Sequence, residues 1–237
     1  MPETAARLVG DVLRAGGCPR DDAFDRFLPE QLSAVSSEYW TPLVVATRAA
    51  AWLDQLRIET VVDIGSGAGK FCVAAALASQ CRFTGLEQSP SLVASAGMLA
   101  TLFGVDDRVS FIEGAFGEVP TPVAECYYLF NPFGDYDFGP GGAVDAKVAC
   151  SAKRYAMDVV TAEDFLQDAP IGTCVLTYNG FGGEVPATYT AIRVDRYLSR
   201  VLRLWRKSPR SGRRTSYRRD SGPATRAQTA AARRAAR

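Results

Sequence analysis

One segment constrains the fold of this chain more than any other, and it runs from Val61 to Phe71 with the sequence VVDIGSGAGKF. A short apolar run leads into three glycines at alternate positions, Gly65, Gly67 and Gly69, and a helical pattern follows them directly. Glycine lets the backbone turn tightly and approach a ligand closely, and the N-terminus of a helix attracts negative charge. The segment therefore predicts a buried strand, a ligand-binding turn and a helix in succession.

Short apolar runs alternate with helical patterns along most of the remaining chain. The pattern predicts strands at 60–64, 83–86, 109–112, 126–130 and 173–178, and helices at 69–79, 91–103 and 148–166. Residues 189–205 alternate well enough to form two final strands at one edge. This rhythm is typical of a mainly parallel sheet with helices on both faces. We expect an α/β fold, Rossmann-like and doubly wound, with seven strands.

The residues before this alternation are predicted to be helical. Apolar residues from Ala5 through Leu8 to Leu13 follow the spacing of one helix face over residues 3–15. A second helix is predicted from Pro42, with Thr41 as its N-cap. We divide the chain into N-terminal helices (1–57), a Rossmann-like ligand-binding domain (58–207) and a basic tail (208–237) that is expected to be disordered.

Composition excludes several classes of protein. Hydrophobic residues make up 47% and charged residues 22%, which is ordinary for a globular protein. No apolar stretch reaches the roughly 18 residues of a membrane span, so we expect no span. The N-terminus lacks the positive cap and apolar segment of a secretory signal, so we expect a cytoplasmic protein, and we expect it to be a monomer. The six cysteines form no C-x-x-C pair and the chain has no histidine, so we expect no metal site and no catalysis by an imidazole.

The net charge of +1 is unevenly distributed. Residues 193–237 carry 15 Lys and Arg against 2 Asp and Glu, whereas residues 1–192 carry 12 against 24. A basic tail of this kind could bind nucleic acid or an acidic membrane surface, although a solvated extension is the interpretation that we favour. Tyr127, Tyr128 and Phe130 lie in the fourth predicted strand, where alternating aromatic residues indicate a buried core.

Spacing separates the ligands that a glycine turn could bind. A P-loop requires glycine five residues before Gly69 and Ser or Thr after Lys70, but Ile64 and Phe71 stand there. A dinucleotide fingerprint that starts at Gly65 requires glycine where Lys70 stands. The P-loop pattern therefore fails at two positions and the dinucleotide fingerprint at one.

The acid, the aliphatic residue and the three glycines of Asp63-Ile64-Gly65-Ser66-Gly67-Ala68-Gly69 resemble motif I of the class I S-adenosylmethionine-dependent methyltransferases. The second predicted strand ends at Glu87, and in that family such a carboxylate holds the two ribose hydroxyls of the cofactor. The resemblance implies that the chain binds S-adenosyl-L-methionine and transfers its methyl group to an acceptor that the sequence does not identify. The residues that it assigns to the cofactor are Asp63, Gly65, Ser66, Gly67, Gly69, Glu87, Gln88, Glu113 and Gly114.

The end of the fourth predicted strand carries a second motif. Asn131-Pro132-Phe133 resembles the N-P-P-[YF] motif of enzymes that methylate amino groups, with one proline in place of two. The resemblance implies that Asn131, Pro132 and Phe133 act on an amine or amide nitrogen, with the Asn side chain accepting its hydrogen bonds and the ring packing on a planar substrate. In open parallel sheets, ligands bind outside the carboxyl ends of the strands, so these residues are expected to line one crevice.

Two other functions stay open at this point. The same architecture and the acid at 87 would suit an NAD(P)-dependent oxidoreductase, against which Lys70 counts. A non-catalytic nucleic-acid-binding protein would use the Rossmann-like body as a scaffold and the basic tail for affinity.

Overall fold

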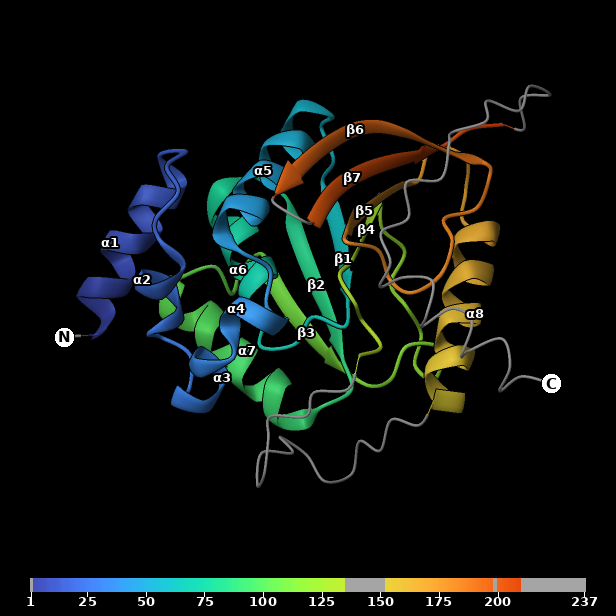
Figure 1. Ribbon diagram of the computed structural model, residues 1–237. Coiled ribbons are helices and arrows are strands. Elements are labelled where there is room, and N and C mark those ends of the chain that lie inside the picture. The colour runs from blue at the N-terminus through green and yellow to red at the C-terminus, as the bar shows by residue number, and fades with distance from the viewer. Residues whose placement is uncertain (1, 135–151, 198–199, 210–237) are drawn as a thin grey trace. The chain divides into compact units, whose positions relative to one another are not determined.

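The computed structural model describes residues 2–134, 152–197 and 200–209 of the chain (Figure 1). They divide into two compact units, a first unit of residues 2–128 and a second unit of residues 129–134, 152–197 and 200–209. Most of the predicted basic tail, from residue 210 on, lies outside the described residues.

Helices and strands alternate as the sequence predicts. The helices in the described residues are α1 (Pro2–Arg14), α2 (Asp21–Asp25), α3 (Glu30–Ala34), α4 (Ser36–Tyr39), α5 (Leu43–Gln55), α6 (Lys70–Ala78), α7 (Pro90–Phe103) and α8 (Ala152–Asp168). The strands are β1 (Thr60–Ile64), β2 (Arg82–Glu87), β3 (Val109–Glu113), β4 (Cys126–Leu129), β5 (Cys174–Tyr178), β6 (Tyr189–Tyr197) and β7 (Arg200–Lys207). Each predicted strand is present, with bounds that differ by at most a few residues.

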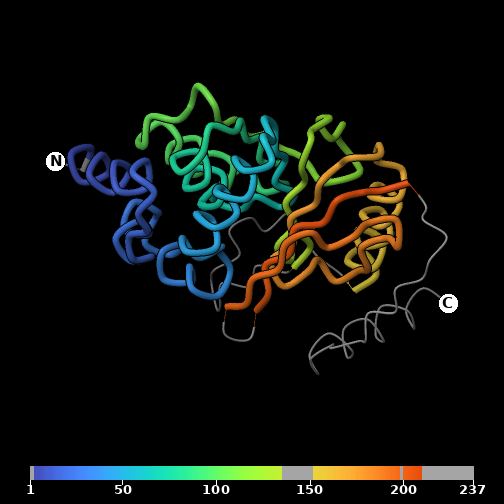
Figure 2. The backbone as a smooth tube through the Cα atoms, turned by 90° about the horizontal axis from the view of Figure 1, so that it is seen from above, coloured from blue at the N-terminus to red at the C-terminus, as the bar shows by residue number. Residues whose placement is uncertain are grey.

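The strands follow the order β3-β2-β1-β4-β5-β7-β6. β1 and β2 are parallel, as are β2 and β3, whereas β7 is antiparallel to both β5 and β6. Figure 2 shows β6 and β7 running side by side. β2 and β3 therefore lie on one side of β1, and β4 to β7 lie on the other side. This arrangement confirms the doubly wound, Rossmann-like sheet of seven strands.

In the first unit, α6 and α7 pack against β2 and β3, and α5 and α1 pack against α6. The α6 sequence KFCVAAALA is apolar after its first residue, and its side chains from Lys70 to Leu77 are all buried. A helix that is apolar on all sides must be buried on all sides, which explains why further helices cover it. α7 begins at an N-cap, Ser89, whose side chain accepts a hydrogen bond from the Leu92 N–H, and it ends at Gly104 in the left-handed conformation.

The N-terminal helices differ from the prediction in two details. Leu8 was placed on the buried face of α1, but its side chain is 65% exposed, while Ala6 and Leu13 are buried. Thr41 does not cap α5, because its hydroxyl forms a 2.7 Å hydrogen bond with the Tyr128 hydroxyl. The N-cap residue is Pro42, and the Leu43 N–H donates to Asp21 Oδ1 at 2.9 Å. The sequence pattern locates both helices, but it could not show which buried polar partner lay near Thr41.

No helix in the described part of the chain is long and apolar enough to cross a membrane.

Candidate functional site

The turn between β1 and α6 has a left-handed backbone at each of its three glycines, which glycine adopts without strain. Gly65, Gly67 and Gly69 have φ values of 73°, 55° and 76°. The N–H groups of Gly65 and Ser66 both donate to the Leu86 carbonyl, at 2.9 and 3.1 Å. These bonds tie the glycine loop, residues 65–69, to the carboxyl end of β2.

Glu87 ends β2 directly beside the glycine loop, and its side chain is buried. One carboxylate oxygen, Oε2, accepts from the Gly67 N–H at 2.9 Å, and the other, Oε1, accepts from the Ser89 N–H at 2.9 Å. Hydrogen bonds to an ionised acceptor are stronger than neutral ones. Because each carboxylate oxygen can accept two hydrogen bonds, these two contacts do not by themselves exhaust its capacity.

Other residues assigned by resemblance lie at the ends of the same strands. Glu113 ends β3 as the register partner of Glu87, and its side chain is exposed. The Gly114 N–H donates to the Glu87 carbonyl at 2.9 Å, and Gln88 follows Glu87 with a half-buried side chain. The first unit therefore brings the predicted cofactor residues together at one edge of its parallel strands.

Asp63 is the fourth residue of β1, and burial raises its pKa from 3.8 to about 7. The charge of Glu87 also raises this pKa, while a hydrogen bond from the Cys72 thiol, with Sγ 3.3 Å from Oδ2, lowers it. Burial and the adjacent Asp63 raise the pKa of Cys72 as well, so the thiol stays protonated and donates. The acid of motif I is thus a buried group, held inside the sheet rather than at its surface.

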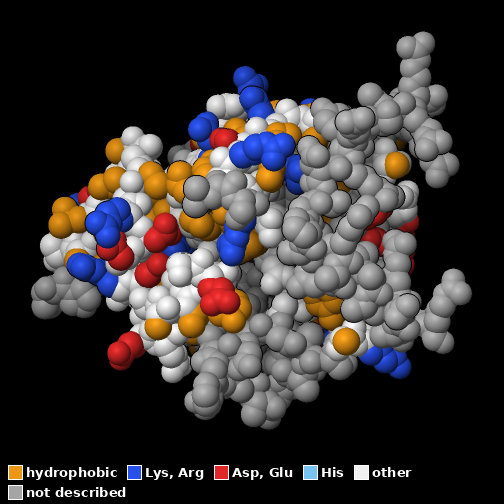
Figure 3. All heavy atoms as spheres, viewed as in Figure 1, with side chains coloured by type: hydrophobic (Ala, Val, Ile, Leu, Met, Phe, Trp, Pro, Cys, Tyr) orange, Lys and Arg blue, Asp and Glu red, His pale blue; other side chains and the backbone are white. Residues whose placement is uncertain are grey.

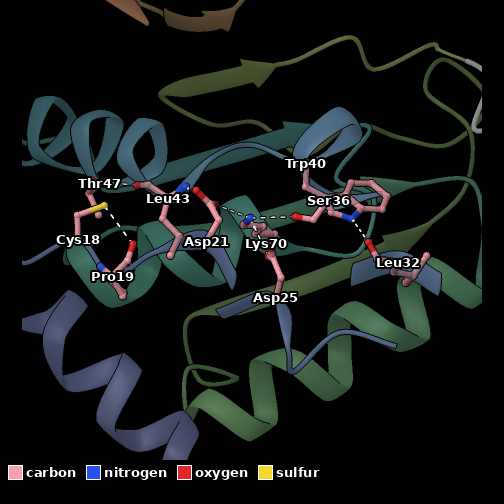
Figure 4. A network of polar contacts seen from close by, with 10 residues as sticks. All are labelled: Cys18, Pro19, Asp21, Asp25, Leu32, Ser36, Trp40, Leu43, Thr47 and Lys70. Atoms are coloured by element: carbon pink, nitrogen blue, oxygen red, sulfur yellow. Dashed lines mark hydrogen bonds and ion pairs between the residues drawn. The ribbon is translucent and has the colours of Figure 1, made fainter. Parts of the chain in front are cut away.

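Lys70 follows the glycine loop and is held by the N-terminal helices (Figure 4). Its ammonium group forms ion pairs with Asp21 Oδ1 at 2.6 Å and Asp25 Oδ1 at 2.7 Å, both from α2, and donates to Ser36 Oγ of α4 at 3.0 Å. The Lys70 side chain is 2% exposed, and a lysine is almost never buried so deeply without paired acids. This network joins the first residue of α6 to two N-terminal helices.

Trp40, the residue that follows α4, lies against the glycine loop. A Cβ atom added at Gly67 would overlap the six-membered ring of Trp40, so the indole lies directly against the Gly67 backbone. The indole N–H donates to the Leu32 carbonyl at 3.0 Å, which fixes the plane of the ring (Figure 4). From the sequence, residues 37–42 could form a lid over the cofactor, but an anchoring role for Trp40 in the first helices was the favoured interpretation. The sequence did not predict the Lys70 network. The available signal was the pair of acids, Asp21 and Asp25, spaced four apart ahead of a lysine that breaks the dinucleotide pattern.

The second motif lies in the second unit. Asn131 has a positive φ of 45° and an exposed side chain, and its N–H donates to the Gly180 carbonyl at 3.2 Å. Pro132 and Phe133 are buried, the latter 6% exposed. Tyr127 and Tyr128 are buried as predicted, but Phe130 is half-buried and was wrongly expected in the core. Phe130, which directly precedes Asn131, therefore keeps part of its ring exposed at the end of β4.

Comparisons with known proteins agree with this architecture. The model of a protein family described as a methyltransferase domain matches residues 57–132. That segment includes the glycine loop, β2, β3 and β4. This segment of the chain is therefore similar to a methyltransferase domain.

Solved structures of methyltransferases share the fold at low sequence identity. An RNA methyltransferase from Salinibacter ruber in complex with S-adenosyl-L-homocysteine is 19% identical, with a TM-score of 0.52, over 75% of this chain and 99% of that one. The mitomycin 7-O-methyltransferase MmcR is also 19% identical, with a TM-score of 0.52, over 75% of this chain and 55% of that one. An O-methyltransferase from neocarzinostatin biosynthesis, in complex with S-adenosylmethionine and a naphthoic acid, is 18% identical, with a TM-score of 0.50, over 78% of this chain and 57% of that one. No curated protein sequence matches the chain.

Proposed function

We propose that this chain transfers a methyl group from S-adenosylmethionine to an amine or amide nitrogen of an acceptor. The observation that carries the proposal is the closure of a three-glycine loop onto the buried carboxylate of Glu87, through the 2.9 Å hydrogen bond from the Gly67 N–H. The loop and the acid both fall inside the segment that matches the methyltransferase domain.

The residues present fit this cofactor. The Ser66 hydroxyl oxygen is buried in the glycine loop and has no hydrogen-bond partner in the described part of the chain. Buried polar atoms are nearly always paired, so an unpaired hydroxyl in this loop supports a polar ligand there. Glu87 supplies the second requirement, since a carboxylate can accept both hydroxyl hydrogens of a ribose diol.

We assign roles to the remaining residues on the same basis. Glu87 would hold the ribose, and the backbone of Gly65, Gly67 and Gly69 together with Ser66 would surround the rest of the cofactor. Asp63, buried in β1 just before the glycine loop, would help to set the conformation of the loop. Gln88, Glu113 and Gly114 would lie beside the nucleoside base. When bound, S-adenosylmethionine supplies an electrophilic methyl group on a sulfonium. Trp40, held against Gly67, would exclude water from this part of the site, as methyl transfer requires.

The acceptor side of the proposal rests on Asn131. Its exposed side-chain amide can accept a hydrogen bond from an amino group and so orient the nitrogen lone pair. Positioning of the nucleophile is the main contribution a protein makes to such a displacement. The cytoplasmic location and the monomeric state expected from the sequence remain predictions, as does the division at residues 57 and 207.

Calorimetry with S-adenosylhomocysteine tests the cofactor assignment. We expect Glu87→Gln to weaken binding about 10- to 100-fold, because one charge-assisted acceptor pair is lost. Glu59→Gln is the matched control, since this exposed acid lies at the opposite end of β1, and it should bind like the original chain. Thermal unfolding of both variants checks that the fold is kept. Equal affinity in Glu87→Gln and the original chain would refute the assignment.

A further inference from the structure

Arg200, the first residue of β7, lies over two aromatic rings of the second unit. Its guanidinium carbon is 5.4 Å from the centre of the Phe130 ring and 5.9 Å from that of Tyr178. The Phe130 and Tyr178 rings are 4.8 Å apart with their planes at 51°, and Tyr197 meets Tyr178 edge-on at 6.4 Å. We call Phe130, Tyr178, Tyr197 and Arg200 the Arg200 cluster.

The backbone places this cluster where α/β sheets bind ligands. Phe130 directly follows β4 and Tyr178 is the last residue of β5, so both lie at carboxyl ends of strands. Each is followed by an asparagine with positive φ, 45° at Asn131 and 61° at Asn179. The Asn179 N–H donates to the Val201 carbonyl at 2.9 Å, which holds the start of β7 beside the end of β5. Asparagine is one of the few residues other than glycine that adopts this left-handed conformation readily, so both strands end in the same kind of turn.

Among the residues that the structure describes, the guanidinium of Arg200 has no acidic partner. Its side chain is half-buried, and in the described part of the chain no carboxylate or carbonyl accepts a hydrogen bond from it. The acid on the neighbouring strand, Asp195, accepts from the Tyr197 hydroxyl at 3.4 Å and from the Arg196 N–H at 2.9 Å. A guanidinium that lies over aromatic rings, and whose N–H groups find no acceptor in the described residues, suits a carboxylate or a phosphate, which it binds through two parallel hydrogen bonds.

We propose that the Arg200 cluster binds the methyl acceptor, and that this acceptor is a planar aromatic ring bearing a carboxylate or phosphate group. The half-buried rings of Phe130 and Tyr197 offer stacking surfaces, and Arg200 supplies the counter-charge. An aromatic carboxylic acid and a nucleotide share this chemistry. The acceptor role rests on the proposed methyl transfer, whereas the binding site does not.

Binding of small probes to the full chain tests the site. Indole-2-carboxylate is planar, aromatic and anionic; indole lacks the charge, and cyclohexanecarboxylate lacks the aromatic ring. By calorimetry, we expect indole-2-carboxylate to bind at least about tenfold more tightly than either of the others. Uridine monophosphate is the nucleotide probe. If it binds more tightly than indole-2-carboxylate, the ligand of the cluster is a nucleotide rather than an aromatic carboxylic acid.

Variants separate the charge from the rings. Arg200→Gln should weaken indole-2-carboxylate at least about tenfold and leave indole unchanged, while Phe130→Leu should weaken both. Arg193→Gln, an exposed arginine of the adjacent strand, removes the same charge outside the cluster and should bind like the original chain. Because Arg200 also packs on rings, Arg200→Lys keeps the charge but removes the fork, and it too should bind more weakly.

Two results would overturn the proposal. One is that neither anionic aromatic probe binds more tightly than indole, and the other is that Arg200→Gln and Arg200→Lys both bind them as the original chain does. S-adenosylhomocysteine is titrated into the same proteins. If it binds throughout, loss of the aromatic probes concerns the acceptor site alone, and if it fails to bind the original chain, the proposed function fails instead and the acceptor role with it.

Discussion

Single side chains in the first unit show how burial changes the chemistry of a familiar motif. The acid of the glycine motif, Asp63, is 3% exposed, and its neighbour Glu87 is 2% exposed, yet the two behave differently. Glu87 accepts two backbone N–H groups, while Asp63 has a pKa raised to about 7 by burial. Asp63 is therefore partly protonated near neutral pH.

This raised pKa makes stability depend on pH. In the unfolded chain Asp63 loses its proton near pH 3.8, whereas in the folded chain it keeps the proton until about pH 7. The folded state binds more protons between these values, so its stability falls as pH rises through this window and levels off above it. The shift corresponds to about 4 kcal/mol at most.

We expect Asp63→Asn to remove most of this loss. Urea unfolding at intervals from pH 4 to pH 8 would show a flatter pH dependence for the variant, which keeps an oxygen for the Cys72 thiol. Parallel curves for the two proteins would mean that Asp63 does not hold its proton in the folded state.

The residues of the site were predictable only in part. Gly65, Gly67 and Glu87 could be placed because a parallel sheet brings the ends of consecutive strands to one edge. Lys70 could not be interpreted in this way, because its partners Asp21 and Asp25 come from a helix of five residues about 50 positions earlier. Pairing over such a distance depends on tertiary packing, which local patterns do not contain.

Among the elements, α2 and α4 depend on α6 for their position. Both are short, and short helices are marginal without tertiary contacts. The surface ion pairs of the same region, Arg7–Asp11 on α1 and Arg20–Asp22 at the start of α2, are exposed. Figure 3 shows basic and acidic side chains next to one another over α1 and α2, at the left of the view. Exposed pairs of this kind stabilise little, so the buried Lys70 network is the stronger connection.

Removal of the buried ammonium should therefore loosen these helices. We expect Lys70→Met to lower the free energy of unfolding by about 3 to 5 kcal/mol, because it leaves the Asp25 carboxylate buried without its ion pair. Arg20→Met, which removes an exposed pair, should change it by less than about 1 kcal/mol. Chemical denaturation of both variants provides the comparison, and equal losses would show that the network contributes no more than a surface pair.

For the whole molecule, both the fold class and the uneven distribution of charge could be predicted from the sequence. The regular alternation of strands and helices identified the doubly wound sheet. Strands and helices could be told apart because apolar residues follow a different spacing in each. The half-buried position of Phe130 was not predictable, because a strand end and a strand interior share the same aromatic pattern.

The charge division leads to a prediction for the full chain. Residues 210–237 contain nine arginines and one aspartate, so the remaining residues have a net charge of −7 although the chain as a whole has +1. All the predicted cofactor residues precede this segment. We expect a chain that ends at residue 209 to bind S-adenosylhomocysteine within about twofold of the full chain, and to lose any salt-sensitive binding of nucleic acid. A large loss of cofactor affinity on truncation, measured by calorimetry, would show that the tail takes part in the site.

The contact between Trp40 and Gly67 means that the two positions are not independent. A side chain at 67 would displace the indole, and a displaced indole would uncover a stretch of main chain shaped to lie beneath a flat aromatic surface. A substitution such as Gly67→Ala would therefore act on the packing of the N-terminal helices as well as on the turn itself.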